Sequence, residues 1–277
     1  MKIRLFSIPI SITSKPQALA VVNEWLRERK LLTINHQLST IKLITTPNPE
    51  MIVAAQSDPE FLKALQSADL AIPDGIGIVW AISLRNFCQR IQFRKLHRVL
   101  KQKQLVITHL SGLDFMEALI GESAKNGWKV MLLGGKPGVG EKAVENLKRT
   151  VLSGRGPSSI KSISGPPDID KVIPVQLNNL INSINSFSPD LLFVAFGHGK
   201  QEKWLNANRK RLNIGVAMGV GGAFDQIADP SLRPPYIINS IGLGWLYRLF
   251  REPWRWRRQL SLVKFIFMVI NHKRINA

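Results

Sequence analysis

The sequence contains one cysteine, Cys88, among its 277 residues. An intrachain disulfide needs two cysteines, so the fold cannot depend on such a bond. Proteins that rely on no disulfide are typical of reducing compartments, and we therefore expect this chain to work in the cytoplasm.

The chain also lacks a run of the ~20 apolar residues that a helix needs to cross a bilayer. Its first residues carry positive charge, a short apolar stretch and an Ala-x-Ala at 18–20, which together outline a secretory leader. Pro9 and Ser11 interrupt the apolar stretch, however. We therefore favour an edge strand over residues 3–12 that leads into a helix over residues 16–30.

Acidic residues are scarce, because 19 Asp and Glu stand against 38 Lys and Arg. The resulting net charge of +19 points to an anionic partner, which could be nucleic acid, acidic lipid or a phosphate-bearing substrate. A hydrophobic content of 45% and a charged content of 21% exclude a disordered chain. The length suffices for one large α/β domain or two small ones.

Strand and helix patterns alternate along the chain. The segments "IKLITTPN", "KVMLLGG", "DLLFVAFG" and "IGVAMGVGG" are apolar strands that end in turns. Continuous apolar strands are typical of parallel sheets that are covered on both faces. We therefore predict an α/β fold with a doubly wound, mostly parallel, Rossmann-like sheet. Helices are predicted over residues 49–66, 113–126, 141–152, 172–187 and 201–210, with a linker over 153–168 and a basic loop or helix face over 85–104.

The composition changes near Asp229. Residues 233–277 carry nine Lys and Arg and a single acidic residue, Glu252. We predict a division into an α/β core over residues 1–232 and a basic, helical C-terminal appendage over residues 233–277.

Four turns at predicted strand ends carry candidate chemistry, because ligands of open parallel sheets bind beyond the carboxyl ends of the strands. Asp74 could cap the next helix or act as a general base that takes a proton from a hydroxyl group. The glycine-rich turn could be a tight turn or a nucleotide contact. The four turns are Thr46-Pro47-Asn48, Pro73-Asp74-Gly75, Gly134 to Gly140 and Gly197 to Glu202.

Two further patterns resemble cofactor or metal motifs. Gly138-Val139-Gly140 resembles part of a dinucleotide fingerprint, but no acidic residue follows about 20 positions later, so we do not expect NAD. Asp168 and Asp170 form a D-x-D, which can hold a metal on a diphosphate. They lie in a predicted linker, so we favour a helix-capping pair. We expect no metal and no cofactor, and we interpret His198 as a loop residue.

Six segments together resemble one family in the same order. They are "TPNPEMIVAA", "ADLAIPDGIGIVWA", "VMLLGGKPGVGEKA", "DLLFVAFGHGKQEKW", "GVGGAFDQIAD" and "RPPYIINSIGLGWLYRLFREPWRWRRQ". This series resembles the WecG/TagA/CpsF family of bacterial glycosyltransferases, which includes N-acetylmannosaminyltransferases and teichoic-acid linkage-unit transferases. The resemblance covers nearly the whole chain.

The resemblance implies an inverting, metal-independent transfer of N-acetylmannosamine or a related sugar from a UDP-sugar. The acceptor would be a polyprenyl-diphosphate-linked sugar at the inner face of the plasma membrane, in cell-surface polysaccharide synthesis. By position, Asp74 matches the catalytic base, and tail arginines would balance the charge of the leaving diphosphate. The implied substrate-binding residues are Thr46, Asn48, His109, Gln201, Arg248, Arg255 and Arg258, and the implied nucleotide-binding residues are Gly134, Gly135, Gly138 and Gly197.

The sequence departs from the family pattern at three places. His109 stands where the family's R-x-T-G-x-D-L has arginine, Gly199 replaces a proline, and Gly244 replaces a glutamate. These departures motivate a second hypothesis, a degenerate member that binds UDP-sugar without transferring it.

The end of the chain allows several interpretations. Arg248, Arg251, Arg255 and Arg258 would share one helix face if the helix continued past Pro253. Residues 260–270 are apolar apart from two positions. Eleven residues are too few to span a bilayer but suit its interface, so we expect contact with an anionic membrane surface. The alternatives are packing on the core or on a second subunit of a homo-oligomer. A nucleic-acid-binding protein is a rival hypothesis from the basic charge, but no such motif is present and we expect no nucleic-acid partner.

Overall fold

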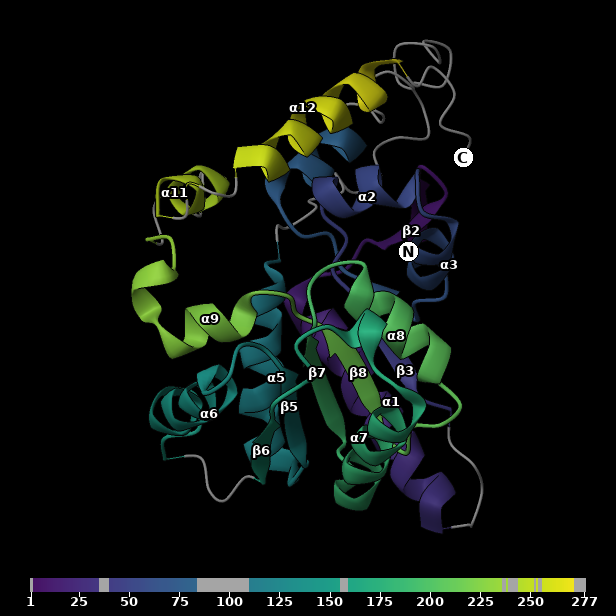
Figure 1. The fold of residues 1–277 in the computed structure, drawn as a ribbon, viewed down its shortest axis with the longest axis vertical. Coiled ribbons are helices and arrows are strands. Elements are labelled where there is room, and N and C mark those ends of the chain that lie inside the picture. The colour runs from purple at the N-terminus through teal and green to yellow at the C-terminus, as the bar shows by residue number, and fades with distance from the viewer. Residues whose placement is uncertain are drawn as a thin grey trace, which may run out of the picture.

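The computed structural model of the chain describes residues 2–34, 40–83, 110–154, 159–235, 238, 244–251, 253 and 256–271. Its centre is a six-stranded sheet with the strand order β4-β3-β8-β7-β5-β6 (Figure 1). Every neighbouring pair in this sheet is parallel, which confirms the predicted α/β class. The strands are β3 (Lys42–Thr45), β4 (Leu70–Ala71), β5 (Val130–Gly134), β6 (Ile160–Ile163), β7 (Leu191–Ala195) and β8 (Val216–Gly219).

Helices cover both faces of the sheet. Along β7, Leu191 and Phe193 pack into one cluster with α1, α5 and α6, whereas Leu192 and Val194 pack into another with α7 and α8. Both sets are apolar because successive side chains of a strand point to opposite faces. The helices are α1 (Lys15–Ile34), α2 (Pro49–Ala55), α3 (Pro59–Gln66), α5 (Gly112–Asn126), α6 (Val139–Thr150), α7 (Pro174–Phe187), α8 (Lys200–Asn208), α9 (Ala223–Ala228), α11 (Gly244–Arg251) and α12 (Trp256–Asn271), with short 3₁₀ turns η1 (Ile169–Lys171) and η2 (Pro230–Leu232).

The predicted edge strand over residues 3–12 is wrong. The chain forms a hairpin of its own, in which β1 (Lys2–Leu5) pairs antiparallel with β2 (Ile8–Ser11). Phe6 and Ser7 make the turn with φ of 50° and 66°. Positive φ at both central residues is the geometry of a tight hairpin turn, but here no glycine or asparagine announces it.

Two other element predictions need correction. The single helix over residues 49–66 is two helices, because Asp58 starts α3 by accepting a hydrogen bond from the backbone N–H of Phe61 at 2.9 Å. The linker over 153–168 contains β6, whose residues are mostly half-buried or exposed at the edge of the sheet and therefore form no apolar run. The predicted helices near α5, α6, α7 and α8 are confirmed, and the basic segment 85–104 lies outside the described residues.

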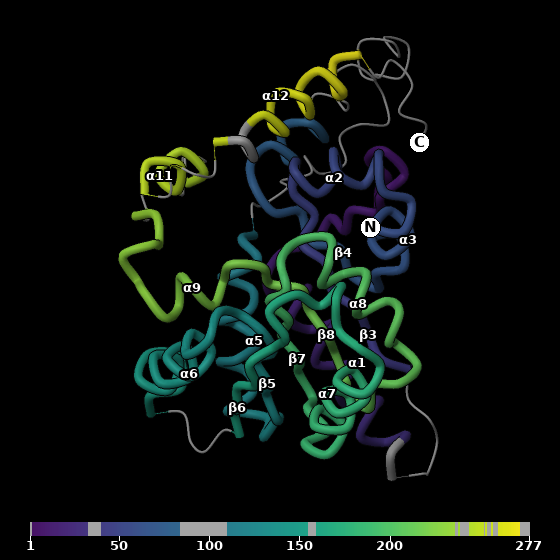
Figure 2. Tube along the Cα trace, viewed as in Figure 1, coloured from purple at the N-terminus to yellow at the C-terminus, as the bar shows by residue number. Residues whose placement is uncertain are grey.

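The helix α12 packs beside α2 and the hairpin, at the end of the molecule beyond the sheet (Figure 2). Phe265 is fully buried there, with its ring centroid 6.3 Å from that of Phe6. One face of the predicted appendage therefore packs on the core, as the alternative interpretation expected. Another face of α12 is exposed and apolar, and it comprises Leu260, Val263, Phe267 and Ile270.

Within the described part of the chain, no helix has both the length and the apolarity to cross a bilayer.

Candidate functional site

The carboxyl ends of the six parallel strands lie at one edge of the sheet, and the predicted turns meet there. Thr46 and Asn48 follow β3, and Asp74 follows β4 three residues after the last residue of the strand. Gly134 closes β5, and Gly197 follows β7. The strand order puts the β3 and β4 turns on one side of this edge, the β5 and β7 turns on the other, and β8 between them.

Asp74 is held by two segments of the chain. Its backbone N–H donates to the carbonyl of Pro47 at 2.9 Å. Its side-chain Oδ1 accepts a hydrogen bond of 3.4 Å from the backbone N–H of Gly112, the first residue of α5. The carboxylate therefore lies at the N-terminus of α5, where backbone N–H groups and the helix dipole attract an anion. This contact orients the side chain at the mouth of the sheet, where a general base would have to be.

The turn after β3 lies against Gly112, the residue whose N–H binds Asp74. A Cβ on Gly112 would come within 3.2 Å of Thr46 Cγ2 and 3.3 Å of Thr46 Oγ1, so the close approach of these segments favours glycine. Asn48 accepts a hydrogen bond from the backbone N–H of Met51 at 2.9 Å and thereby caps α2. Thr46 thus lies beside Gly112, which binds the side chain of Asp74. Asn48 caps α2, in addition to the substrate-binding role predicted for it.

The four predicted nucleotide-binding glycines all adopt positive φ. At Gly134, a Cβ would lie 2.8 Å from the carbonyl oxygen of Ala195 and 2.9 Å from the ring of Phe196, so packing between β5 and β7 excludes a side chain. Around Gly138, the N-cap of α6, and around Gly197 there is open space instead. The turn between β5 and α6 therefore combines a packed glycine with an open helix N-terminus, which is a geometry suited to an anion. The backbone N–H of Gly135 donates to the carbonyl oxygen of Ala195 at 3.0 Å, which ties this turn to the end of β7.

Gln201 is only 3% exposed, and its amide is hydrogen-bonded within the protein. Its Nε2 donates to Glu202 Oε1 at 2.8 Å, and its Oε1 accepts from the backbone N–H of Gly221 at 3.1 Å. Glu202 Oε2 in turn accepts from the backbone N–H of Gly199 at 2.8 Å. Burial raises the pKa of Glu202 to about 7, against the opposing effect of these hydrogen bonds.

Sequence reasoning missed the part that Glu202 plays. It interpreted this residue only as a favourable charge in the first turn of a helix. A glutamate three residues after a helix-capping position is the signal that could have indicated its bond back to Gly199. Nothing in the sequence indicated its bond to Gln201.

The described part of the C-terminal segment reaches the same edge through Arg248. The guanidinium Nη2 lies 3.5 Å from the position that a Cβ on Gly222 would take, in the turn after β8. Two hydrogen bonds of 3.1 Å to Ser231, from Tyr247 Oη and from Arg251 Nη2, tie α11 to the core.

Three predicted residues cannot be placed. His109 and Arg255 lie outside the described residues, and of Arg258 only its position in α12 is described.

The D-x-D pair holds a lysine. Lys200 Nζ lies 2.5 Å from Asp168 Oδ1 and 3.1 Å from Asp170 Oδ2. The hydrogen bond from Lys200 lowers the pKa of Asp168, and the same bond raises the pKa of Lys200. Asp168 also accepts from the backbone N–H of Asp170 at 3.2 Å and caps η1, whereas Asp170 lies within η1, so the predicted capping pair is confirmed at Asp168 alone. In the described ranges, no three His, Cys, Asp or Glu side chains gather as metal ligands would.

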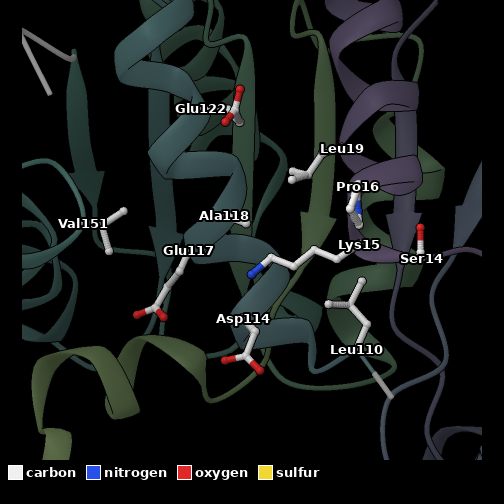
Figure 3. Close-up of a pocket in the computed structure, with 10 residues that line it drawn as sticks. All are labelled: Ser14, Lys15, Pro16, Leu19, Leu110, Asp114, Glu117, Ala118, Glu122 and Val151. Atoms are coloured by element: carbon white, nitrogen blue, oxygen red, sulfur yellow. The ribbon is translucent and has the colours of Figure 1, made fainter. Parts of the chain in front are cut away.

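A surface cavity of about 670 Å³ lies between the first turn of α1 and α5 (Figure 3). Asp114, Glu117 and Glu122 line it, and Figure 3 shows Lys15 extending toward the first two. None of the predicted site residues lines this cavity. Because its carboxylates would repel a diphosphate, we place the candidate site at the neighbouring turns and not here.

Comparison with known proteins finds one matching family and two named relatives. The family model described as "Glycosyl transferase WecG/TagA/CpsF family" matches residues 3–277. A protein of Bacillus subtilis (strain 168) is 32% identical over 233 residues, which is 84% of this chain and 80% of the relative. A protein of Bacillus spizizenii (strain ATCC 23059 / NRRL B-14472 / W23) is 28% identical over 238 residues, with the same shares. Both relatives are named N-acetylglucosaminyldiphosphoundecaprenol N-acetyl-beta-D-mannosaminyltransferase.

Proposed function

This chain belongs to the WecG/TagA/CpsF family of glycosyl transferases, and we propose that it moves N-acetylmannosamine or a related sugar from a UDP-sugar to a polyprenyl-diphosphate-linked sugar. The names of the two relatives support this class of donor sugar and acceptor. The reaction would serve the synthesis of a cell-surface polysaccharide.

The observation that carries the proposal is the position of Asp74. Its carboxylate lies at the carboxyl edge of the sheet, oriented by the N-terminus of α5 and next to the turn that holds Thr46. In the proposed reaction it takes the proton of the acceptor hydroxyl while the acceptor oxygen forms a bond to the anomeric carbon. The bond from that carbon to the diphosphate breaks on the opposite face, and UDP leaves with the electron pair. A single displacement of this kind inverts the anomeric centre.

Positive charge at the same edge supports the departure of the diphosphate. Arg248 reaches the turn after β8, and Arg255 and Arg258 are proposed to join it. Charge-assisted hydrogen bonds from arginines stabilise phosphate oxygens without a metal. Metal independence is part of the proposal, and its support is that Asp168 and Asp170, the acidic pair of the D-x-D, bind Lys200.

We also propose that the enzyme lies on the inner face of the plasma membrane, through its C-terminal appendage. The exposed face of α12 presents Leu260, Val263, Phe267 and Ile270, spaced three or four residues apart. Such a stripe can enter the interface of a bilayer, and the net charge of +19 favours anionic lipids. A peripheral enzyme placed in this way would meet an acceptor that is itself anchored in the membrane.

A donor panel tests the proposed activity. The full-length protein is incubated with UDP-N-acetylmannosamine and other UDP-sugars, and with a short-chain lipid-diphosphate N-acetylglucosamine acceptor, with and without EDTA. We expect one UDP-sugar to give a disaccharide product of inverted anomeric configuration by NMR, at a rate that EDTA does not change. Absence of product with every donor contradicts the transferase proposal. Product of retained configuration contradicts the single displacement.

The same preparation separates the rival functions. A degenerate family member would bind UDP in calorimetry without forming product. A nucleic-acid-binding protein, the alternative suggested by the net charge, would bind oligonucleotides tightly and in a salt-dependent manner without any turnover.

A further inference from the structure

A chain of three hydrogen bonds links two turns of the candidate site. Gly199 N–H, in the turn after β7, donates to Glu202 Oε2 at 2.8 Å. Glu202 Oε1 accepts from Gln201 Nε2 at 2.8 Å, and Gln201 Oε1 accepts from the N–H of Gly221, in the turn after β8, at 3.1 Å. The Glu202 side chain is 4% exposed and that of Gln201 is 3% exposed. We call this series the Gly199–Gly221 relay.

The relay has one direction only. Both of its ends are backbone N–H groups, which can donate but cannot accept. Glu202 must therefore accept with both oxygens, and Gln201 must donate with one end of its amide and accept with the other. If the Gln201 amide were reversed, its Nε2 would face the N–H of Gly221, and two donors would meet in a buried place without an acceptor.

The relay lies directly under the end of a central strand. A Cβ on Gly219, the last residue of β8, would come within 2.6 Å of Gln201 Nε2 and 2.8 Å of Glu202 Oε1. The two side chains therefore fill the space that a larger residue at this position would take. Two residues further on, Gly221 receives the relay, and the adjoining Gly222 lies beside the guanidinium of Arg248.

We propose that Glu202 is a positioning residue that acts through Gln201 to hold the turn after β8 in the conformation that receives Arg248. This inference rests on the proposed function and deepens it, because Arg248 is the described arginine assigned there to the leaving diphosphate. The strand order separates β8 from β4 by β3, so the relay lies apart from Asp74. Loss of the relay should therefore weaken donor binding more than it slows the chemical step.

A pair of variants tests the direction of the relay. Glu202→Gln has nearly the shape of the natural side chain, but it brings a second donor into the relay and so forces two donors together at Gly199 or at Gly221. The double variant Gln201→Glu with Glu202→Gln exchanges the two residue types. In it, residue 202 can accept from Gly199 and donate to residue 201, which accepts from Gly221. All three hydrogen bonds are restored with the same number of atoms and charges.

For Glu202→Gln we expect the donor KM and the Kd of UDP to rise about tenfold, the factor that corresponds to 1.4 kcal/mol, with kcat nearly unchanged. The double variant should return both constants to within about threefold of the wild type, since its hydrogen bonds are complete. The exchange at residue 201 should not itself alter donor contacts, because the side chain there is 3% exposed and both polar atoms of Gln201 are bonded within the protein rather than turned to the substrate. Asn208→Ala is the matched control. It removes another buried polar side chain of α8, which binds the carbonyl of Trp204, and should leave the donor KM unchanged.

Each outcome decides the matter. Three results would overturn the proposal. The double variant could fold and still show a raised donor KM, or it could fail to fold. Alternatively, Glu202→Gln could keep the wild-type donor KM. If Glu202→Gln does not fold, the double variant alone decides it by comparison with the wild type. Amide hydrogen exchange of residues 219–222 needs no substrate. It should accelerate in Glu202→Gln and recover in the double variant even if the wild type transfers no sugar, an outcome that would refute the proposed function and not the relay.

Discussion

Single residues at the edge of the sheet owe their positions to partners far away in the sequence. Asp74 meets the backbone N–H of Gly112, which is 38 positions further along the chain. Gln201 meets that of Gly221, 20 positions further on. Both partners are backbone groups, one at the start of α5 and one in the turn after β8. The orientation of these side chains therefore depends on the order of the strands and cannot be derived from local motifs.

The raised pKa of Glu202 makes the stability of the protein depend on pH. The ordinary value of 4.5 applies to the unfolded chain, and the folded value is about 7. Between these values the folded protein holds a proton that the unfolded chain has released. The contribution of Glu202 to the free energy of unfolding is therefore largest below pH 4.5 and falls as the pH rises through 7, by roughly 3 kcal/mol.

Chemical denaturation of the wild type and of Glu202→Gln across pH 5 to 8 measures this effect. Residue 202 cannot titrate in the variant. The free energy of unfolding of the wild type should therefore fall relative to that of the variant as the pH rises toward about 7. A difference that stays constant over this range would show that Glu202 is not buried as described.

Among the elements, α12 has two apolar faces with different surroundings. Phe265 is fully buried in the apolar cluster that joins the β1–β2 hairpin to α2. Phe267, two residues later, is 61% exposed. Deleting residues 233–277 would remove both faces at once and uncover part of a core cluster. Point substitutions separate the two faces.

Phe265→Ala should lower the free energy of unfolding by about 3–5 kcal/mol, because it leaves a cavity beside Phe6. The same substitution at Phe267 should change it by less than about 0.5 kcal/mol, because the side chain is mostly exposed. Denaturant titrations of the two variants measure both values. Equal destabilisation would mean that α12 does not dock in the described orientation.

The exposed face of α12 should carry membrane binding. Leu260→Ser together with Phe267→Ser should weaken binding to anionic liposomes at least about tenfold, since each buried apolar side chain contributes about 1.5–3 kcal/mol. Sedimentation with liposomes measures it. Ile173→Ser with Val175→Ser removes two exposed apolar side chains near the start of α7 and serves as the control. Undiminished binding of the α12 variant would place the membrane contact elsewhere.

For the whole molecule, the sheet could be predicted because its central strands are buried on both faces and therefore appear as continuous apolar runs. The hairpin was missed because its turn at Phe6 and Ser7 contains no glycine or asparagine, the residues that favour positive φ at both central positions. The strand β6 was missed because only Ile160 is buried in it. The turns of the site could be predicted from the rule that ligands bind at strand ends. Their contacts with α5 and α11 could not, because these depend on how distant segments pack.

The central claim is that Asp74 takes the proton of the acceptor, and its most direct test is the single-turnover transfer rate of Asp74→Asn. Asparagine can still accept the hydrogen bond from Gly112, so the turn should keep its geometry, but its amide cannot take the proton. We expect the rate to fall by about 10² to 10⁴, with the Kd of UDP within about threefold of the wild type. A variant that transfers sugar at nearly the wild-type rate would contradict the account.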